Sequence, residues 1–249
     1  MEKVLVCMPY FDNGKQGREL EMSLTGWKKF AQFPFRIVII GDYNPVVDKF
    51  DFASWIPCNR VNEISGQYLP HLDMVNKFKF AYDLYHEAYN SFIWVCDDYY
   101  PVHEFDYNYI KKYYYLQPNF IGDIKRPSNT WQHDLAKTGR LLRNNGFKCV
   151  NFTTHFPIVF EFEKLINMFD KFDMYHNSYV IENLYCNYYD VQKDIQADSI
   201  RLGVWRQEDS FQKLDDILNN KYDVRKFIAC SVVGYNSIFE KKLCKYLGI

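Results

Sequence analysis

Two adjacent carboxylates, Asp97 and Asp98, follow a short apolar run in the middle of the chain. The run Ser91–Cys96 has the pattern of a buried strand, and open α/β sheets bind ligands at the carboxyl ends of such strands. Neighbouring carboxylates repel in water-poor surroundings, and Mg²⁺ or Mn²⁺ would relieve this repulsion because these ions prefer oxygen ligands and share them with diphosphates. The pattern therefore predicts a metal site. The alternative is a turn in which one acid is a cap and the other is solvated.

A lysine lies on the apolar side of the helix predicted from Asp73 to about Ala88. At about 100° per residue, Lys77 is in line with Ala81 and Leu84, inside the apolar arc. A lysine in this position must pair with an acid or extend its amine to solvent. Because the helix leads into the strand that ends at the acid pair, Lys77 could meet those carboxylates or the phosphates of a bound ligand. Extension to solvent is the alternative.

Alternating strand and helix patterns predict how these groups are positioned. The apolar runs Val4–Met8, Phe35–Ile40 and Ser91–Cys96 are typical of buried parallel strands. Helical spacing over residues 20–31 and 73–88 separates them. The sequence therefore predicts an α/β fold with a mostly parallel sheet and helices on both of its faces.

The second half of the chain predicts further helices and strands. The expected helices are Tyr109–Leu116, Trp131–Asn145, Glu163–Phe172, Tyr179–Tyr189 and Ile238–Leu247, and the expected strands are Trp55–Pro57, Lys148–Phe152 and Lys226–Val233. His133 and Asp134 are neighbours on the second of these helices. Adjacent helical residues point about 100° apart, so we expect these two to lie on the surface and to form no common site.

Length and charge limit the class of protein. A chain of 249 residues favours one enlarged α/β domain. With 30 Lys and Arg against 31 Asp and Glu, the net charge of −1 does not indicate a nucleic-acid partner. Seven cysteines without a Cys-x-x-Cys pair are typical of reduced thiols and not of a disulfide framework or a zinc site. No signal peptide and no apolar stretch of roughly 20 residues is visible, so we expect a cytoplasmic protein without a membrane span.

This order of elements, with a strand that ends in Asp-Asp-aromatic, resembles the GT-A fold of glycosyltransferases, especially the bacterial and phage enzymes that build surface glycans. The resemblance covers roughly the first 190 residues. The usual family motif is Asp-x-Asp, whereas this chain has Cys96-Asp97-Asp98, so the first acid is absent or displaced by one position. The resemblance implies that Asp98 ligates Mn²⁺ or Mg²⁺ directly. Asp97 would act through water or contact the ribose.

The resemblance also implies a nucleoside site at the ends of the first two strands. The loop after the first strand would stack on the base through an aromatic ring and hydrogen-bond it through a polar side chain, although an ordinary turn fits the same residues. Asp42, after the second strand, would contact the base or ribose, or it is a turn residue after Gly41. The loop residues are Pro9, Tyr10, Phe11, Asp12 and Asn13.

On the acceptor side the resemblance implicates His155 and Glu182. An imidazole at His155 could ligate the metal, bind a phosphate or hold the acceptor, or it could simply bond within its own turn. Glu182 opens a predicted helix, and inverting members of the family use an acid in this region to deprotonate the acceptor hydroxyl. The alternative is an acid in the first helical turn that the helix dipole favours.

These observations predict metal-dependent transfer of a monosaccharide from a nucleotide sugar, with a UDP-sugar expected, to a glycan or another hydroxyl acceptor. Residues 1–105 would bind the nucleotide sugar and residues 106–249 the acceptor, within one domain spanning 1–249. A nucleotidyltransferase is an alternative, but it would usually carry a glycine-rich basic loop after the first strand. A non-catalytic domain that binds carbohydrate or nucleotide is another, because the acid motif is displaced.

Overall fold

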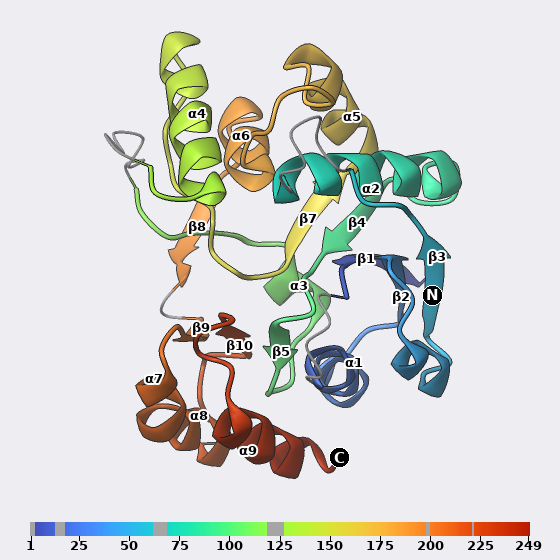
Figure 1. The fold of residues 1–249 in the computed structure, drawn as a ribbon, viewed down its shortest axis with the longest axis vertical. Helices are drawn as coiled ribbons and strands as arrows, with labels where there is room; N and C mark the ends of the chain where they lie inside the picture. The colour runs from blue at the N-terminus through green and yellow to red at the C-terminus, as the bar shows by residue number, and fades with distance from the viewer. Residues whose placement is uncertain (1–2, 13–17, 62–68, 119–126, 198–199, 221) are drawn as a thin grey trace.

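The computed structural model describes residues 3–12, 18–61, 69–118, 127–197, 200–220 and 222–249. Within them, five strands form the central sheet in the order β3-β2-β1-β4-β7 (Figure 1). The strands β1 to β4 run parallel, and β7 pairs antiparallel with β4 at one edge. The predicted mostly parallel α/β sheet is confirmed. The strand bounds are β1 (Val4–Tyr10), β2 (Phe35–Gly41), β3 (Ala53–Pro57), β4 (Ser91–Trp94) and β7 (Ile158–Glu161).

Helices cover both faces of this sheet, which explains why β1 and β2 are apolar without alternation. The helix α1 (Glu19–Phe30) packs on one face, where its Trp27 joins Val6 and Ile37 in one core cluster. The helix α2 (Pro70–Tyr85) packs on the other, where Phe78 joins Leu5 and Val38 in a second cluster. Both faces of the central strands are therefore buried.

Three more helices lie on the α2 side of the sheet (Figure 1): α4 (Thr130–Asn144), α5 (Phe162–Lys171) and α6 (Ile181–Tyr188). The strand predicted at Lys148–Phe152 is wrong. This segment forms a single bridge with the rest of the structure, from Asn151 to Gln117. Amide side chains of α6 take the place of a neighbouring strand: Asn187 exchanges two hydrogen bonds of 2.8 Å with the Val150 backbone, and Asn183 accepts one of 2.5 Å from Phe152 N–H.

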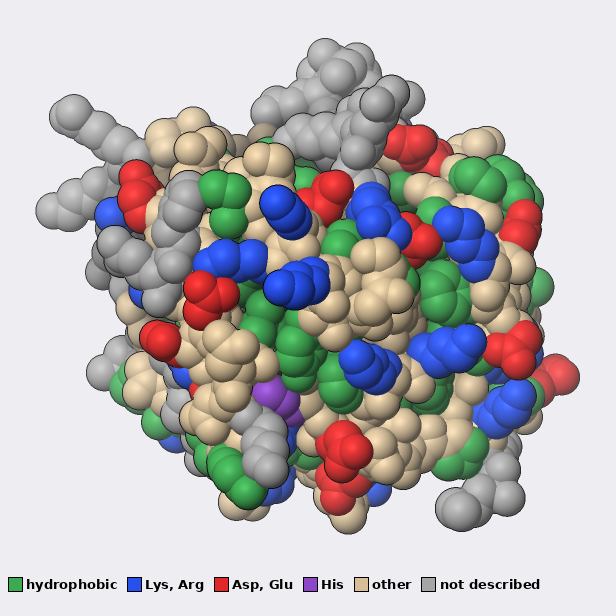
Figure 2. Space-filling model, turned by 90° about the horizontal axis from the view of Figure 1, so that it is seen from below, with side chains coloured by type: hydrophobic (Ala, Val, Ile, Leu, Met, Phe, Trp, Pro, Cys, Tyr) green, Lys and Arg blue, Asp and Glu red, His purple; other side chains and the backbone are tan. Residues whose placement is uncertain are grey.

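A second sheet, with strand order β5-β10-β9, follows the acid pair and lies near the C-terminal helices (Figure 1). The predicted late strand is confirmed with shorter bounds, and the predicted terminal helix is confirmed and begins one residue earlier than expected. The elements of this region are β5 (Tyr99–Pro101), β9 (Arg201–Val204), β10 (Phe227–Cys230), α7 (Gln207–Gln212), α8 (Leu214–Asn219) and α9 (Ser237–Leu247). In the first half of the chain, the 3₁₀ turn η1 (Pro45–Lys49) connects β2 to β3. On the face seen from below, side chains of both charge signs are interspersed (Figure 2).

The helix predicted at Tyr109–Leu116 is also wrong. One helical turn, α3 (Tyr107–Ile110), is followed by the short strand β6 (Tyr113–Tyr115), which pairs in parallel with β8 (Lys193–Gln196). Consecutive tyrosines favour an extended backbone when they pack on a half-buried surface. Here the middle one, Tyr114, is buried against Phe156, with ring centroids 4.7 Å apart.

At Gly41 the backbones of β1 and β2 and the Lys77 side chain of α2 come into close contact. Its φ of 133° lies in a region that residues with a Cβ rarely adopt. A Cβ at this position would lie 2.2 Å from the carbonyl oxygen of Tyr10 and 3.1 Å from Nζ of Lys77. Glycine is therefore required where these two strands end.

We expect Gly41→Ala to lower the free energy of unfolding by about 3 kcal/mol, at the upper end for strained backbone, because backbone strain and a steric clash add. Gly146→Ala is the matched control: Gly146 also has a positive φ, of 70°, but nothing lies within 4 Å of its added Cβ. It should cost about 1–2 kcal/mol from backbone strain alone. Urea denaturation measures both, and equal losses would contradict the role of the close contact.

Candidate functional site

Asp97 and Asp98 lie where β4 has ended and β5 has not begun, in a cavity of about 110 Å³. Glu19, the first residue of α1, and Ser231, which follows β10, also line it. A site for a whole small molecule usually has at least about 300 Å³. This cavity can therefore take an ion with a few ligand atoms, and a larger ligand would extend beyond it.

The electrostatics of the pair favour a bound cation. Burial raises the pKa of Asp97, and the charge of Glu19 adds to this, while Lys77 opposes it. Burial and the charge of Asp97 raise the pKa of Asp98 well above its usual range. Oδ1 of Asp98 is buried without a hydrogen-bond partner. Within the described residues, no group of three or more His, Cys, Asp or Glu side chains is placed to hold a metal, so other ligands would have to come from substrate or water.

The ends of β1 and β2 bring Asp12 and Asp42 together. Oδ2 of Asp42 accepts a hydrogen bond of 2.9 Å from Asp12 N–H and one of 3.0 Å from Arg60. Arg60, which the sequence analysis did not single out, also lies over the ring of Phe11. Asn13 lies outside the described residues.

Tyr10 and Pro9 belong to β1 itself and not to a loop after it. Tyr10 is buried, and its hydroxyl accepts a hydrogen bond of 2.9 Å from Asn44. The exposed aromatic pair beside Asp42 is instead Tyr43 and Trp55, 46% and 37% exposed, with ring centroids 5.2 Å apart. Tyr43 directly follows Gly41-Asp42 at the end of β2, which is the sequence signal for it, whereas Trp55 comes from the neighbouring strand β3.

Lys77 is buried along its whole length, at 1% exposed, so extension to solvent is wrong. Its Nζ donates to Asp73 at 2.7 Å and to the carbonyl oxygen of Tyr10 at 3.2 Å. Its described bonds do not reach Asp97 directly, yet its charge lowers the pKa of that acid. The spacing of Asp73 and Lys77, four residues apart on one helix, is the signal that identifies the partner.

His155 lies close to the acid pair because it packs on a residue next to that pair. Its imidazole packs on the ring of Tyr99, the residue after Asp98, and on Trp205, with centroids 6.2 and 5.0 Å away. One side of the residue remains open to solvent. Crowding by protein and then the charge of Arg201 lower the pKa of His155 to about 4, so the imidazole is neutral at pH 7. Arg201 also holds the loop by donating to the carbonyl oxygen of Thr154.

Glu182 is the second residue of α6 and is 7% exposed. Its Oε2 is buried without a hydrogen-bond partner. Burial raises the pKa of Glu182, while the charge of His71 lowers it. Burial raises the pKa of Cys96 and of Tyr99, and the charge of Glu182 adds to both shifts. Glu182 therefore faces the chain on either side of the acid pair.

Comparison with known proteins gives a likeness in fold. No family model matches the chain, and no curated protein matches its sequence. The structure is similar to an apo structure of the bifunctional glycosyltransferase WbbM, with a TM-score of 0.53 and 12% sequence identity. The likeness covers 98% of this chain and 49% of the other, so this chain spans about half the length of that protein. The chain has a glycosyltransferase-like α/β fold.

Within this glycosyltransferase-like fold, the sequence analysis missed a buried polar cluster. Asp134 was expected on the surface, but it is buried, and its Oδ2 lies 2.8 Å from Nδ1 of His71. The neighbouring His133 is exposed, as expected. The signal that places Asp134 inside is its helical spacing with Thr138 and Leu142, both buried on the same helix.

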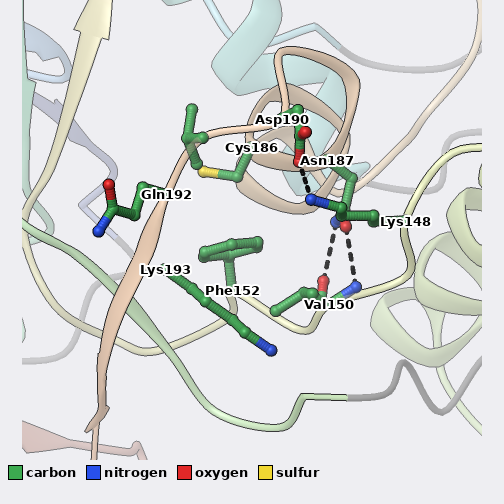
Figure 3. A pocket seen from close by; sticks show the side chains of 9 residues that line it. Lys148, Val150, Phe152, Cys186, Asn187, Asp190, Gln192 and Lys193 are labelled. Carbon is green, nitrogen blue, oxygen red and sulfur yellow. Dashed lines mark hydrogen bonds and ion pairs between the residues drawn. The ribbon is translucent and has the colours of Figure 1, made fainter.

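A second cavity, of about 400 Å³, opens beside α6 (Figure 3). The ring of Phe152 lies between Cys186 and Lys193 in this view. At the rim, Lys148 pairs with Asp190 at 2.5 Å. Cys186 is one helical turn beyond Glu182; burial raises the pKa of its thiol, and the charge of Glu182 adds to this. This cavity therefore adjoins the helix that carries Glu182. Within the described residues, no helix has the length and apolarity needed to cross a membrane.

We expect Lys77→Met to lower the free energy of unfolding by about 3–5 kcal/mol, because it leaves Asp73 buried with an uncompensated charge. Lys79→Met is the control, since Lys79 pairs with Asp83 at the same spacing but on the exposed side of α2. That change should cost less than about 1 kcal/mol. Adding Asp73→Asn to Lys77→Met should restore part of the loss. Urea denaturation measures the free energy of unfolding of each variant. Similar losses for Lys77→Met and Lys79→Met would rule out a buried charge pair.

Proposed function

We propose that the protein transfers a monosaccharide from a nucleotide sugar, most simply a UDP-sugar, to a hydroxyl acceptor in a reaction that depends on a divalent metal. One observation carries this proposal. A buried carboxylate pair, with an unsatisfied oxygen on Asp98, lies at the carboxyl end of a parallel strand in a glycosyltransferase-like fold. Ligands of open α/β sheets bind at this edge.

The carboxylates suit Mn²⁺ or Mg²⁺. Both ions take oxygen ligands and keep positions for water and phosphate oxygens. Asp98 would bind the ion directly through its free oxygen, and Asp97 directly or through water. The neutral imidazole of His155, which packs on Tyr99, would be a further ligand of the ion or a donor to phosphate. When bound, the cation would neutralise charge that develops on the leaving diphosphate.

The nucleoside would bind over the ends of β1 to β3. Asp42 is held by Arg60 and by the backbone of Asp12, so its carboxylate has a fixed position for a ribose hydroxyl or base N–H. Tyr43 and Trp55 offer exposed ring surface for a base beside it. Tyr10 and Lys77 would support this edge from beneath, because both are buried.

The acceptor would be deprotonated by Glu182. A general base works best when its pKa is close to the working pH, and burial moves the pKa of Glu182 in that direction. As the acceptor oxygen bonds to the anomeric carbon, its proton moves to Glu182, and the carbon–oxygen bond to the diphosphate breaks with the electron pair leaving on phosphate. The cavity beside α6 is the natural place for the rest of the acceptor.

Asp98→Asn should weaken Mn²⁺-dependent binding of UDP by at least tenfold, or about 1.4 kcal/mol, since it removes the charge but keeps the shape. Calorimetric titration with and without Mn²⁺ measures this. Asp215→Asn, at an exposed carboxylate paired with Lys242, is the control and should bind as wild type. Metal-dependent binding at full strength in Asp98→Asn would overturn the metal assignment.

Glu182→Gln should reduce sugar transfer by at least about 100-fold, the low end for loss of a general base. Mn²⁺–UDP binding should persist. In wild type the rate should rise with pH through a value above the ordinary glutamate range, because the deprotonated form is active and burial raises the pKa. Glu163→Gln, at an exposed glutamate, is the control. Normal turnover in Glu182→Gln together with loss in His155→Ala would move the base to His155.

A further inference from the structure

The strand that follows the acid pair decides which side chains face the acid cavity. The carbonyl oxygen of Asp98 accepts a hydrogen bond of 3.2 Å from Cys230 N–H, so the ladder between β5 and β10 begins at Asp98. Side chains alternate between the two faces along a strand. Asp98 and Tyr100 accordingly line the same cavity, whereas Tyr99 between them packs on His155.

Tyr100 brings a buried hydroxyl to this cavity. The residue is 0% exposed, and its ring packs on Phe239 of α9 with centroids 5.5 Å apart. Among the residues that the structure describes, its hydroxyl has no hydrogen-bond partner, and the same holds for Oδ1 of Asp98. Buried polar groups in proteins are mostly bonded to protein, water or a ligand, because an unmet bond is costly. Two such oxygens around one small cavity indicate that it takes a ligand with polar atoms.

The elements around the cavity hold Tyr100 in place. The hydroxyl of Ser23 on α1 donates to the carbonyl oxygen of Tyr99 at 3.0 Å, and Glu19, one helical turn before Ser23, lines the cavity. On the other side, Ile228 of β10 lies opposite Tyr100 in the antiparallel pair with β5. The backbone of Tyr100 is therefore fixed between α1 and β10.

A hydrated divalent cation fits these groups. Across the described parts of the chain, no three acidic, histidine or cysteine side chains are placed to hold a metal together, so waters or substrate atoms would complete its coordination. A cavity of about 110 Å³ has room for an ion and a few waters. The charge of the ion polarises a bound water and makes it a strong donor, and a tyrosine hydroxyl can accept as well as donate.

We propose that Tyr100 is a positioning residue for the cation: its hydroxyl bonds a water in the coordination shell of the ion and holds that shell against Asp98. The inference rests on the metal assignment of the proposed function and adds a residue that touches neither the ion nor the nucleotide sugar. A phenylalanine would fill the same space beside Phe239, so the bond to the water is what the hydroxyl contributes.

The test is a titration of Tyr100→Phe with Mn²⁺, with and without UDP, followed through the electron paramagnetic resonance signal of the free ion. The affinity for Mn²⁺ should fall by about tenfold, the low end for loss of a group that orients metal ligands. Asp98→Asn should weaken binding at least as much. Tyr114→Phe is the matched control: Tyr114 is also buried, but its hydroxyl donates to the carbonyl oxygen of Tyr109 at 2.9 Å, and the variant should bind Mn²⁺ as wild type.

Melting temperatures of the metal-free variants distinguish this role from a structural one. Tyr100→Phe should melt no lower than wild type, because it removes a hydroxyl without a partner in the described residues. Tyr114→Phe should melt about 2–4 °C lower, because it loses a hydrogen bond. A lower melting temperature for Tyr100→Phe, or its failure to fold, would show that the hydroxyl supports the fold and would overturn the proposal.

The outcomes separate this inference from the proposed function. If Asp98→Asn weakens Mn²⁺ binding and Tyr100→Phe does not, the role of Tyr100 is overturned and the metal site stands. If wild type binds no Mn²⁺ with or without UDP, the metal assignment and this inference both fall. In transfer assays, Tyr100→Phe should need about tenfold more Mn²⁺ for half of its maximal rate. An unchanged Mn²⁺ requirement would overturn the positioning role.

Discussion

The buried ion pair between Lys77 and Asp73 is the constraint on which the ligand-binding edge depends. Two charges removed from water cost several kcal/mol each, and they are tolerated only when further hydrogen bonds complete them. Here the further partners are the carbonyl oxygen of Tyr10 and the N–H of Val61. The pair thus ties α2 to the ends of the strands, and it does so through the space that Gly41 leaves open.

Next to this edge, the candidate site contains more acidic than basic side chains. Asp97, Asp98 and Glu19 face one cavity, and the charge of Lys77 partly offsets them. Glu182 lies close to the same stretch of chain with one oxygen unsatisfied. Groups whose pKa values are raised by burial cluster at sites of binding and chemistry, because such an arrangement has no structural benefit. A bound cation would relieve the repulsion between Asp97, Asp98 and Glu19, and a proton would satisfy the buried oxygen of Glu182.

The sequence predicts the parts of this fold that depend on local pattern. The buried strands β1, β2 and β4 are continuous apolar runs, and the helices have clear helical spacing. The segment 148–152 has the same apolar character as a strand, but its hydrogen-bond partners are Asn183 and Asn187, more than thirty positions away. No local pattern contains that information.

In the candidate site, too, some residues can be identified from local sequence patterns and others only from tertiary packing. The acid pair and Glu182 can be identified from strand and helix ends, and Asp73 follows from its spacing to Lys77. The helical spacing of Asp134 with Thr138 and Leu142 indicates that it is buried, but its partner, His71, is 63 positions away and no local pattern identifies it. Helical spacing indicates which face of its helix a residue lies on, but the residue it contacts on another helix is decided only when the helices pack.

The amide bonds between α6 and the segment 150–152 have a mechanical consequence. Asn183 and Asn187 fasten the backbone that leads to His155 onto the helix that carries Glu182. Tyr185 of the same helix accepts a hydrogen bond of 3.1 Å from Glu161 N–H of β7, so α6 holds this backbone in a fixed place relative to the sheet as well.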